Sequence, residues 1–352
     1  KGFKQAKADG DLRAAASFMN SAASARFAMF RYGEALEAYT EARRLARAAG
    51  DLETLAVVSS NLSSLYLHQN DKNASLQAAG EALAALDGLA PSSHAALLRA
   101  QIALVRSAHG DFESALALFG RALADAQLGD DRRTLALLWD QAGYELLKRG
   151  RFVEAERAFL EAFRLRKLHR LPDMQYSYYA FGMLHRTLGD ARSARRLLDR
   201  ALEEAERNPG TLPLWRVLYE RGLASLESGA AAEALSDLRR SLEAARLVRA
   251  QFLPAESTTI GTSLTLHGVS AALIRAAFRL YRDQGDASSA ALALAAAEDS
   301  RAASLRGLIY APAEWRRRLP PEYWRLLSRM HAAAAAPQAP AHQHPPVRLL
   351  LD

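Results

Sequence analysis

The sequence predicts an all-α fold, a helical solenoid of about seven hairpins that follow one another with a period of about 40 residues. Two observations support this prediction. A glycine-centred motif recurs at nearly constant spacing, and the 352-residue chain is 50% hydrophobic but only 8% aromatic. A chain of this length exceeds one compact helical bundle and suits a repeat array. Its abundant alanine favours helices that pack closely.

The repeated motif is a glycine followed by an aromatic residue at +2, alanine at +5, a large apolar residue at +9 and alanine at +12. Two copies match it in full, Gly110-Phe112-Ala115-Phe119-Ala122 and Gly150-Phe152-Ala155-Phe159-Ala162. Weaker copies stay in phase, so that the anchors fall at positions 30, 70, 110, 150, 189, 229 and 285. Five steps of 39 or 40 residues are followed by one of 56, which indicates an insertion before the last hairpin.

Elementary packing explains the motif. The two alanines lie seven positions apart, on one face of a helix, where small side chains let a neighbouring helix approach closely. The glycine permits the sharp turn at the end of the preceding helix. A single hairpin leaves its apolar face uncovered, so stacked neighbours must supply the core.

In chain order, the motif predicts helix pairs over 12–29 with 32–48, 51–69 with 72–87, 92–109 with 112–127, 131–149 with 152–168, 172–188 with 191–206, 211–228 with 231–249, and 264–284 with 287–308. Aspartates near the helix starts are expected to cap free amides: Asp51, Asp71, Asp111, Asp131, Asp173, Asp190 and Asp286. We expect a solenoid over 1–308, a connecting region over 309–336 whose last helix begins after Pro320-Pro321, and a flexible linker over 337–352.

Composition excludes several classes of site. The chain contains no cysteine, which excludes disulfides, thiolate catalysis and cysteine–zinc sites within it. No apolar run is long enough to predict a transmembrane helix, and the first nine residues lack the apolar core of a secretory signal. We therefore expect a cytoplasmic protein with no membrane partner. The chain opens without Met and stops within the run 347–352, which suggests a fragment of a longer protein.

The net charge of +7 fits nucleic-acid binding. However, Arg and Glu alternate along the predicted solvated helix faces, and no interleaved stacking motif accompanies them. Nucleic acid is therefore a disfavoured partner.

No residue pattern indicates catalysis. The sequence has no nucleophile motif, phosphate loop or zinc-ligand spacing, so we expect no enzymatic activity, cofactor or metal in this segment. Asp140 and Glu145 lie on one predicted helix and are expected to be solvated, and His185 is expected to lie at the edge of the core.

Further residues of the motif resemble the tetratricopeptide repeat. An aromatic and a small residue precede the anchor by eleven and seven positions in that family. Here Trp139 and Gly143 precede Gly150, and Tyr178 and Gly182 precede Gly189. The resemblance covers about residues 12 to 308, in units longer than usual for the family. It implies that the first helix of each hairpin lines a concave groove that holds a protein or peptide partner.

The resemblance also implies which residues face that groove: Asn61, Gln101, Gln141, Tyr144, Lys148, Tyr176, Tyr179, Arg186, Arg216 and Tyr219. The amides occupy the same place in three successive units and suit a peptide backbone. The tyrosines and basic residues suit an extended or acidic segment. The alternative is that the tyrosines only pack between hairpins. Ser60, Ala100 and Asp140 stand where Lys would serve a chaperone-tail clamp, which disfavours that function.

The last predicted hairpin carries a second resemblance. Glu298, Arg301, Ala302 and Leu305 match the closing repeat of tetratricopeptide arrays that precede a CHAT domain in bacteria. CHAT domains are caspase-like proteases with a His–Cys dyad. Because this chain has no cysteine, the resemblance implies the sensing and regulatory scaffold, with any protease domain in cis after residue 352.

Two other functions remain open. One is the peptide- or ligand-sensing module of a transcription regulator, which a neighbouring helix-turn-helix would favour. The other is a self-associating structural scaffold, which concentration-dependent sedimentation would favour.

Overall fold

The computed structural model describes residues 2–28, 31–208, 212–250 and 260–309, and over these residues the chain folds into helices joined by short turns. The helices are α1 (Gly2–Ala8), α2 (Leu12–Ala28), α3 (Tyr32–Ala48), α4 (Leu52–His68), α5 (Lys72–Asp87), α6 (Ser93–Ala108), α7 (Phe112–Leu128), α8 (Arg132–Lys148), α9 (Phe152–Leu168), α10 (Met174–Thr187), α11 (Ala191–Arg207), α12 (Leu214–Glu227), α13 (Ala231–Ala250), α14 (Ile260–Gln284) and α15 (Ala287–Ile309). The all-α prediction and the predicted helix pairs are confirmed. The expected connecting region beyond 309 and the linker over 337–352 lie outside the described residues.

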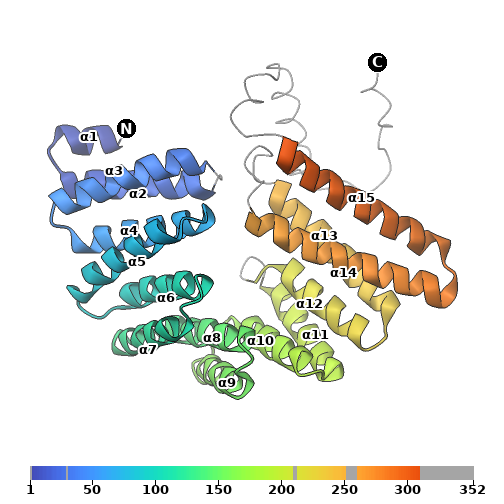
Figure 1. Ribbon diagram of the computed structural model, residues 1–352. Helices are drawn as coiled ribbons and strands as arrows, with labels where there is room; N and C mark the ends of the chain where they lie inside the picture. The colour runs from blue at the N-terminus through green and yellow to red at the C-terminus, as the bar shows by residue number, and fades with distance from the viewer. Residues whose placement is uncertain (1, 29–30, 209–211, 251–259, 310–352) are drawn as a thin grey trace.

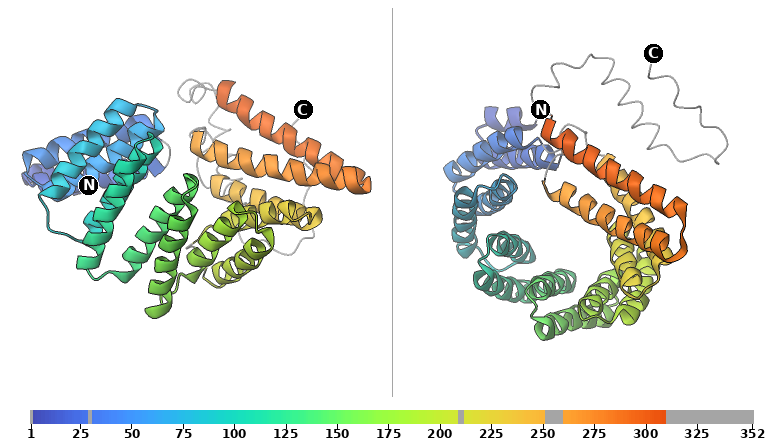
Figure 2. Two further views of the ribbon diagram at one scale, coloured as in Figure 1. Left: turned by 60° about the horizontal axis from the view of Figure 1, so that its bottom comes forward. Right: turned by 45° about the vertical axis from the view of Figure 1, so that its right-hand side comes forward.

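The helices form a curved stack of hairpins (Figure 1). Each even-numbered helix from α2 to α14 packs against the odd-numbered helix that follows it, and each odd-numbered helix from α3 to α13 packs against the next even-numbered helix. The even-numbered helices also contact one another in succession along one side of the stack. Seen from other directions, the hairpins curve round an open middle (Figure 2).

The sequence motif did not predict α1. This short helix packs through Ala6 against Ala15 and Ala16 of α2 and against Leu45 of α3. It therefore covers the first hairpin at the N-terminal end of the stack.

The predicted anchors are the turns inside the hairpins. Gly189 has a φ of 84°, in the left-handed region that glycine reaches without strain. The degenerate second copy of the motif places Asn70 at the same point, with a φ of 58°. Asparagine is one of the few other residues that adopt this conformation readily, so the same turn forms with Asn70 in place of glycine.

The small residue seven positions before each anchor, the −7 residue, sets the distance between the helices of a hairpin. A Cβ atom added to Gly182 would lie 2.6 Å from Cγ of Leu198, and one added to Gly222 would lie 2.7 Å from Cγ of Leu238. Gly143 meets Phe159 in the same way. The −7 glycine and the large +9 residue therefore form a hole and a knob that repeat along the stack.

Most of the expected aspartate caps are present. Five carboxylates accept hydrogen bonds from backbone amides of the following turn, those of Asp51, Asp71, Asp131, Asp190 and Asp286. Asp111 and Asp173 make no capping hydrogen bond. Instead, Asp111 accepts a hydrogen bond from Arg106, and Asp173 pairs with Arg166. Both carboxylates are thus paired with an arginine.

Within the described residues, none of the helices combines the length and the apolar character needed to cross a bilayer.

Candidate partner-binding surface

All ten predicted groove residues lie on the even-numbered helices α4 to α12. We call the side along which these helices contact one another the inner surface. Nine of the ten form an amide group on α4, α6 and α8 and a tyrosine–arginine group on α8, α10 and α12, and Lys148 ends α8.

The amide group connects neighbouring helices. Nδ2 of Asn61 donates a hydrogen bond to Oδ1 of Asn20 at 3.1 Å, and Nε2 of Gln101 donates one to Oγ of Ser64 at 2.9 Å. The next amide of the series, Gln141, has a buried Oε1 atom without a hydrogen-bond partner in the described chain. Asn61 and Gln101 thus hold successive hairpins together, and a bound backbone would have to compete with these contacts.

Three tyrosines and one arginine come together farther along the inner surface. The rings of Tyr144 and Tyr179 meet edge to face, with centroids 6.3 Å apart. Burial raises the pKa of Tyr144, Tyr176 and Tyr179, while the positive charge of Arg216 acts in the opposite direction on each. The charge of Arg216 therefore acts on all three tyrosines. We call these four residues the Tyr–Arg cluster.

The members of the Tyr–Arg cluster differ in exposure. Tyr179 is 9% exposed, and the Tyr144 hydroxyl is buried with no hydrogen-bond partner among the described residues. Tyr176 is half-buried and Arg216 is exposed. Tyr144 and Tyr179 thus pack between hairpins, as the alternative interpretation of the sequence held, whereas Tyr176 and Arg216 leave part of their surface accessible.

Arg216 has no acidic partner among the described residues. Its guanidinium carbon lies 5.3 Å from the centroid of the Trp215 ring, and no carboxylate of the described chain pairs with it. Arg186, by contrast, forms ion pairs with Glu220 at 2.7 Å and Glu227 at 2.9 Å. Arg186 therefore joins α10 to α12 and is already neutralised.

The two remaining predicted residues lie on either side of the Tyr–Arg cluster. Lys148 is exposed and pairs with Glu145 at 2.5 Å. Tyr219 is half-buried, and its hydroxyl points towards α14, where it would meet a Cβ atom added to Gly268 at 3.3 Å. The positive charge of the exposed Arg275 acts on Tyr219 as Arg216 acts on the cluster.

Beneath the Tyr–Arg cluster lies a buried ionic group that the sequence analysis missed. Arg166 of α9 donates to Asp140 Oδ2 at 2.5 Å and to Ser177 Oγ at 2.9 Å, and its Nε lies 3.5 Å from Asp173 Oδ1. Its guanidinium carbon is 5.7 Å from the centroid of the Tyr176 ring. The group ties α8, α9 and α10 together and supports the ring of Tyr176 from below.

The prediction that Asp140 and Glu145 are solvated is wrong. Asp140 is 1% exposed, and burial raises its pKa to about 6 although the charge of Arg166 acts to lower it. Glu145 is 4% exposed and accepts hydrogen bonds from Lys148 and from Ser107 of the neighbouring α6. Arg166 and Ser107 reach these carboxylates from α9 and α6, so the periodicity of α8 alone gave no signal of their burial.

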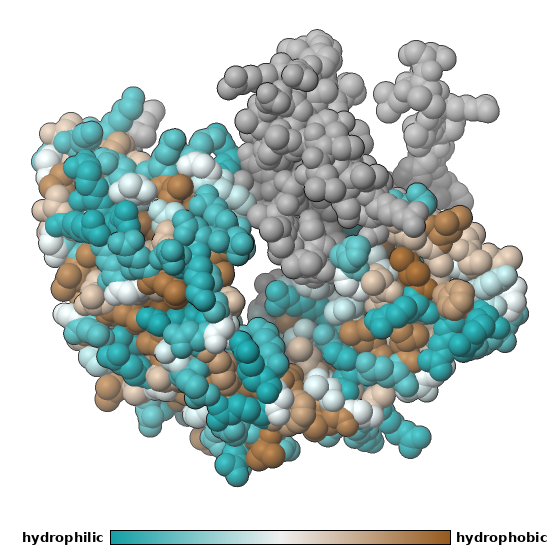
Figure 3. Space-filling view, viewed as in Figure 1, coloured by the Kyte–Doolittle hydropathy of each residue, from teal (hydrophilic) through white to brown (hydrophobic). Residues whose placement is uncertain are grey.

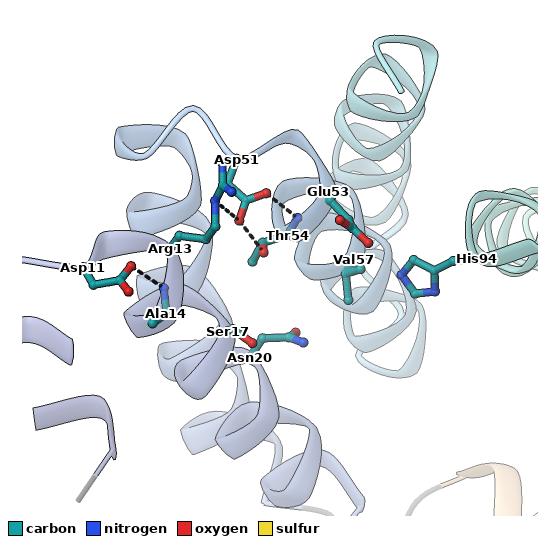
Figure 4. Close-up of a pocket in the computed structure, with 10 residues that line it drawn as sticks. All are labelled: Asp11, Arg13, Ala14, Ser17, Asn20, Asp51, Glu53, Thr54, Val57 and His94. Atoms are coloured by element: carbon teal, nitrogen blue, oxygen red, sulfur yellow. Dashed lines mark hydrogen bonds and ion pairs between the residues drawn. The ribbon is translucent and has the colours of Figure 1, made fainter. Parts of the chain in front are cut away.

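A separate cleft of about 480 Å³ opens between α2, α4 and the start of α6 (Figure 4). It is lined by Asp11, Arg13, Ala14, Ser17, Asn20, Asp51, Glu53, Thr54, Val57 and His94. Two of its carboxylates already serve the fold, because Asp11 caps α2 and Asp51 caps α4 and pairs with Arg13 at 3.4 Å. Arg13 is the one arginine of the lining, against the three carboxylates of Asp11, Asp51 and Glu53.

Comparison with solved structures establishes the fold. Aspartyl phosphate phosphatase F from Bacillus subtilis superposes with a TM-score of 0.59 at 14% identity, over 85% of this chain and 72% of that one. The fold is a tetratricopeptide-type solenoid. A Rap protein complexed with Competence and Sporulation Factor gives a TM-score of 0.54 at 15% identity, over 83% of this chain and 76% of that one.

A third similar structure is a signal transduction ATPase with numerous domains and a tetratricopeptide repeat sensor, from Pyrococcus horikoshii. It gives a TM-score of 0.55 at 13% identity, and the match covers 92% of this chain but 44% of that chain. No protein-family model matches the sequence. No curated protein matches it either.

Proposed function

We propose that this chain is a protein-interaction scaffold whose inner surface binds an extended partner segment that carries acidic side chains. The single observation behind this proposal is Arg216, an exposed guanidinium whose charge acts on three tyrosines and which pairs with no carboxylate among the described residues. Arginine binds carboxylates through charge-assisted hydrogen bonds, and tyrosine offers a broad apolar surface with a polar tip.

The surroundings of Arg216 favour an acidic partner. Exposed cations continue along the inner surface at Arg275 on α14, while the acidic residues nearby, Glu220 and Glu227, are already paired with Arg186. Such a surface attracts negative charge and repels a basic segment. One of the similar solved structures, a Rap protein complexed with Competence and Sporulation Factor, is compatible with partner binding by this fold.

Peptide titration tests the proposal. Fluorescein-labelled peptides rich in Glu, and matched peptides with Gln at every Glu, are titrated with the full chain and followed by anisotropy. We expect the Glu peptides to bind more tightly, and Arg216→Gln to weaken them by about tenfold through loss of a charge-assisted hydrogen bond.

Arg164→Gln is the matched control, because Arg164 lies on the odd-numbered helix α9 and pairs with Glu161 on the same helix. This control should bind the Glu peptides as the wild type does. Equal affinity of the wild type and Arg216→Gln for the Glu peptides would refute the assignment of Arg216.

The finer proposal is that the scaffold is the partner-sensing part of a bacterial CHAT-type, caspase-like protease in the cytoplasm. It rests on the sequence resemblance at Glu298, Arg301, Ala302 and Leu305. A gene that encodes a His–Cys caspase-like domain after this segment would support it, and a helix-turn-helix beside the array would favour the transcription regulator instead. A self-associating scaffold would sediment faster as the concentration of the chain rises.

A further inference from the structure

The last described hairpin, α14–α15, differs from the earlier ones in the side chains at the knob and hole. In earlier hairpins the large +9 residue is fully buried, as for Phe159, Leu198 and Leu238, each at 0% exposure. Leu294 holds the same place in α15 and is 65% exposed. The −7 position is Phe278 in place of a small residue, and this ring is 59% exposed.

These residues define an apolar face at the C-terminal end of the stack. Tyr281 lies one turn after Phe278 and is 45% exposed, so α14 and α15 together present two aromatic rings and a leucine. We call these three residues the terminal face. In Figure 3 hydrophobic residues gather over α14 and α15. Side chains of this size are rarely left together in water on a soluble protein.

The construction of the stack indicates what belongs there. Every odd-numbered helix from α3 to α13 is covered by the even-numbered helix that comes next in the chain. After α15 the chain continues for 43 residues, from 310 to 352. Within them, Tyr323, Leu327 and Met330 recur at the spacing of one helix face, directly after Pro320-Pro321.

A second copy of the chain fits the terminal face less well. The complementary end of another copy would be its first hairpin, which α1 already covers through Ala6 and Phe3. In addition, Phe278 and Leu294 do not form the buried hole and knob of the earlier hairpins, and both side chains are exposed at the end of the stack. The terminal face therefore suits a single helix whose side chains pack around the exposed ring of Phe278.

We propose that residues 321–336 of the same chain form an amphipathic helix that packs through Tyr323, Leu327 and Met330 on the terminal face. This helix closes the C-terminal end of the solenoid as α1 closes the N-terminal end. Any domain that follows would then be joined to the array through a fixed helix, so that the array and that domain move together.

The absence of cysteine from the chain permits a direct test. In the full-length chain, Leu294→Cys is combined with Met330→Cys, and the protein is treated with a short bismaleimide at low concentration. We expect an intramolecular cross-link between the two positions, identified by mass spectrometry of the monomer band.

Two control pairs locate the contact. Leu294→Cys with Ser328→Cys places the second thiol on the opposite face of the proposed helix, and Leu128→Cys with Met330→Cys places the first on α7, where Leu128 is 73% exposed. Both should cross-link much less. Equal yields from all three pairs would show an untethered segment and overturn the proposal, and so would cross-links found only between chains, which would assign the face to a second copy.

A second measurement checks the same contact without cross-linking. Leu294→Ser should increase the rate of proteolytic cleavage within 310–336, since the segment would lose part of its binding surface. Leu128→Ser, on an equally exposed leucine, should leave that rate unchanged. If both variants are cleaved at the wild-type rate, the segment does not pack on the terminal face.

Discussion

Arg166 shows how a single side chain can decide the local structure of this solenoid. Arg166 lies on α9, and its guanidinium is fully buried. It pairs with Asp140 of α8 and with Asp173, which precedes α10. Buried charges are stable only when paired, and removal of one partner leaves the other uncompensated. The ring of Tyr176 rests on the same guanidinium, so this buried group also positions a residue of the inner surface.

Arg166→Leu should therefore destabilise the fold strongly. It leaves Asp140 and Asp173 buried without their cation, at a cost of about 3–5 kcal/mol. Urea denaturation followed by circular dichroism measures the change. Arg164→Leu, two residues earlier and on the exposed side of α9, should change stability little. Equal effects of the two variants would contradict the structural role of Arg166.

The pH dependence of stability follows from Asp140. Burial raises its pKa from an ordinary 3.8 to about 6, so the folded state holds the proton more tightly than the unfolded state. The resulting stabilisation is complete below pH 3.8 and is lost as the pH rises to about 6. Compared with Asp140→Asn, which does not titrate, the wild type should lose stability across this window and stay level above it. Parallel curves for the two proteins, measured by thermal melts at fixed salt, would contradict the burial of an ionisable Asp140.

At the scale of the helix, the repeat motif predicted the features that depend on packing within a hairpin. It missed the features that depend on residues outside the motif. The hairpin helices follow from alanine, glycine and large apolar residues at fixed offsets, and α11, predicted over 191–206, is Ala191–Arg207. The inner-surface residues could be assigned to the correct helices for the same reason. Helix α1 was missed because it lies outside the repeated motif. The burial of Asp140 was missed because Arg166 reaches it from another helix.

Gly182→Ala tests the spacing of the helices within a hairpin. The new Cβ would lie 2.6 Å from Cγ of Leu198, so α10 and α11 must move apart, which typically costs about 1–3 kcal/mol. Gly120→Ala is the matched control, because the space around Gly120 in α7 is open and alanine favours the helix. Chemical denaturation should show Gly182→Ala less stable than the wild type and Gly120→Ala equal to it or more stable. Two neutral substitutions would show that the small residue at −7 is dispensable.

At the scale of the whole molecule, the two ends of the stack and its inner surface have different requirements. The ends must be covered to keep apolar side chains from water, and α1 does this at the N-terminal end. The proposed function needs an inner surface that stays open to a partner. The charges along this surface are paired where they join helices, as at Arg186, and unpaired among the described residues at Arg216. The sequence repeats alone do not distinguish these requirements, because the motif describes the packing within hairpins and not the ends or the inner surface of the stack.

The packing of each helix against its immediate neighbours also governs how the molecule comes apart. Few contacts join segments distant in sequence, so the contact order is low and folding can begin at any hairpin and spread in both directions. Amide protons should then exchange with deuterium in blocks the length of a hairpin. The slowest block should include α8 to α10, where the buried arginine adds an ionic bond to the apolar core, and the chain should unravel from its margins towards that block.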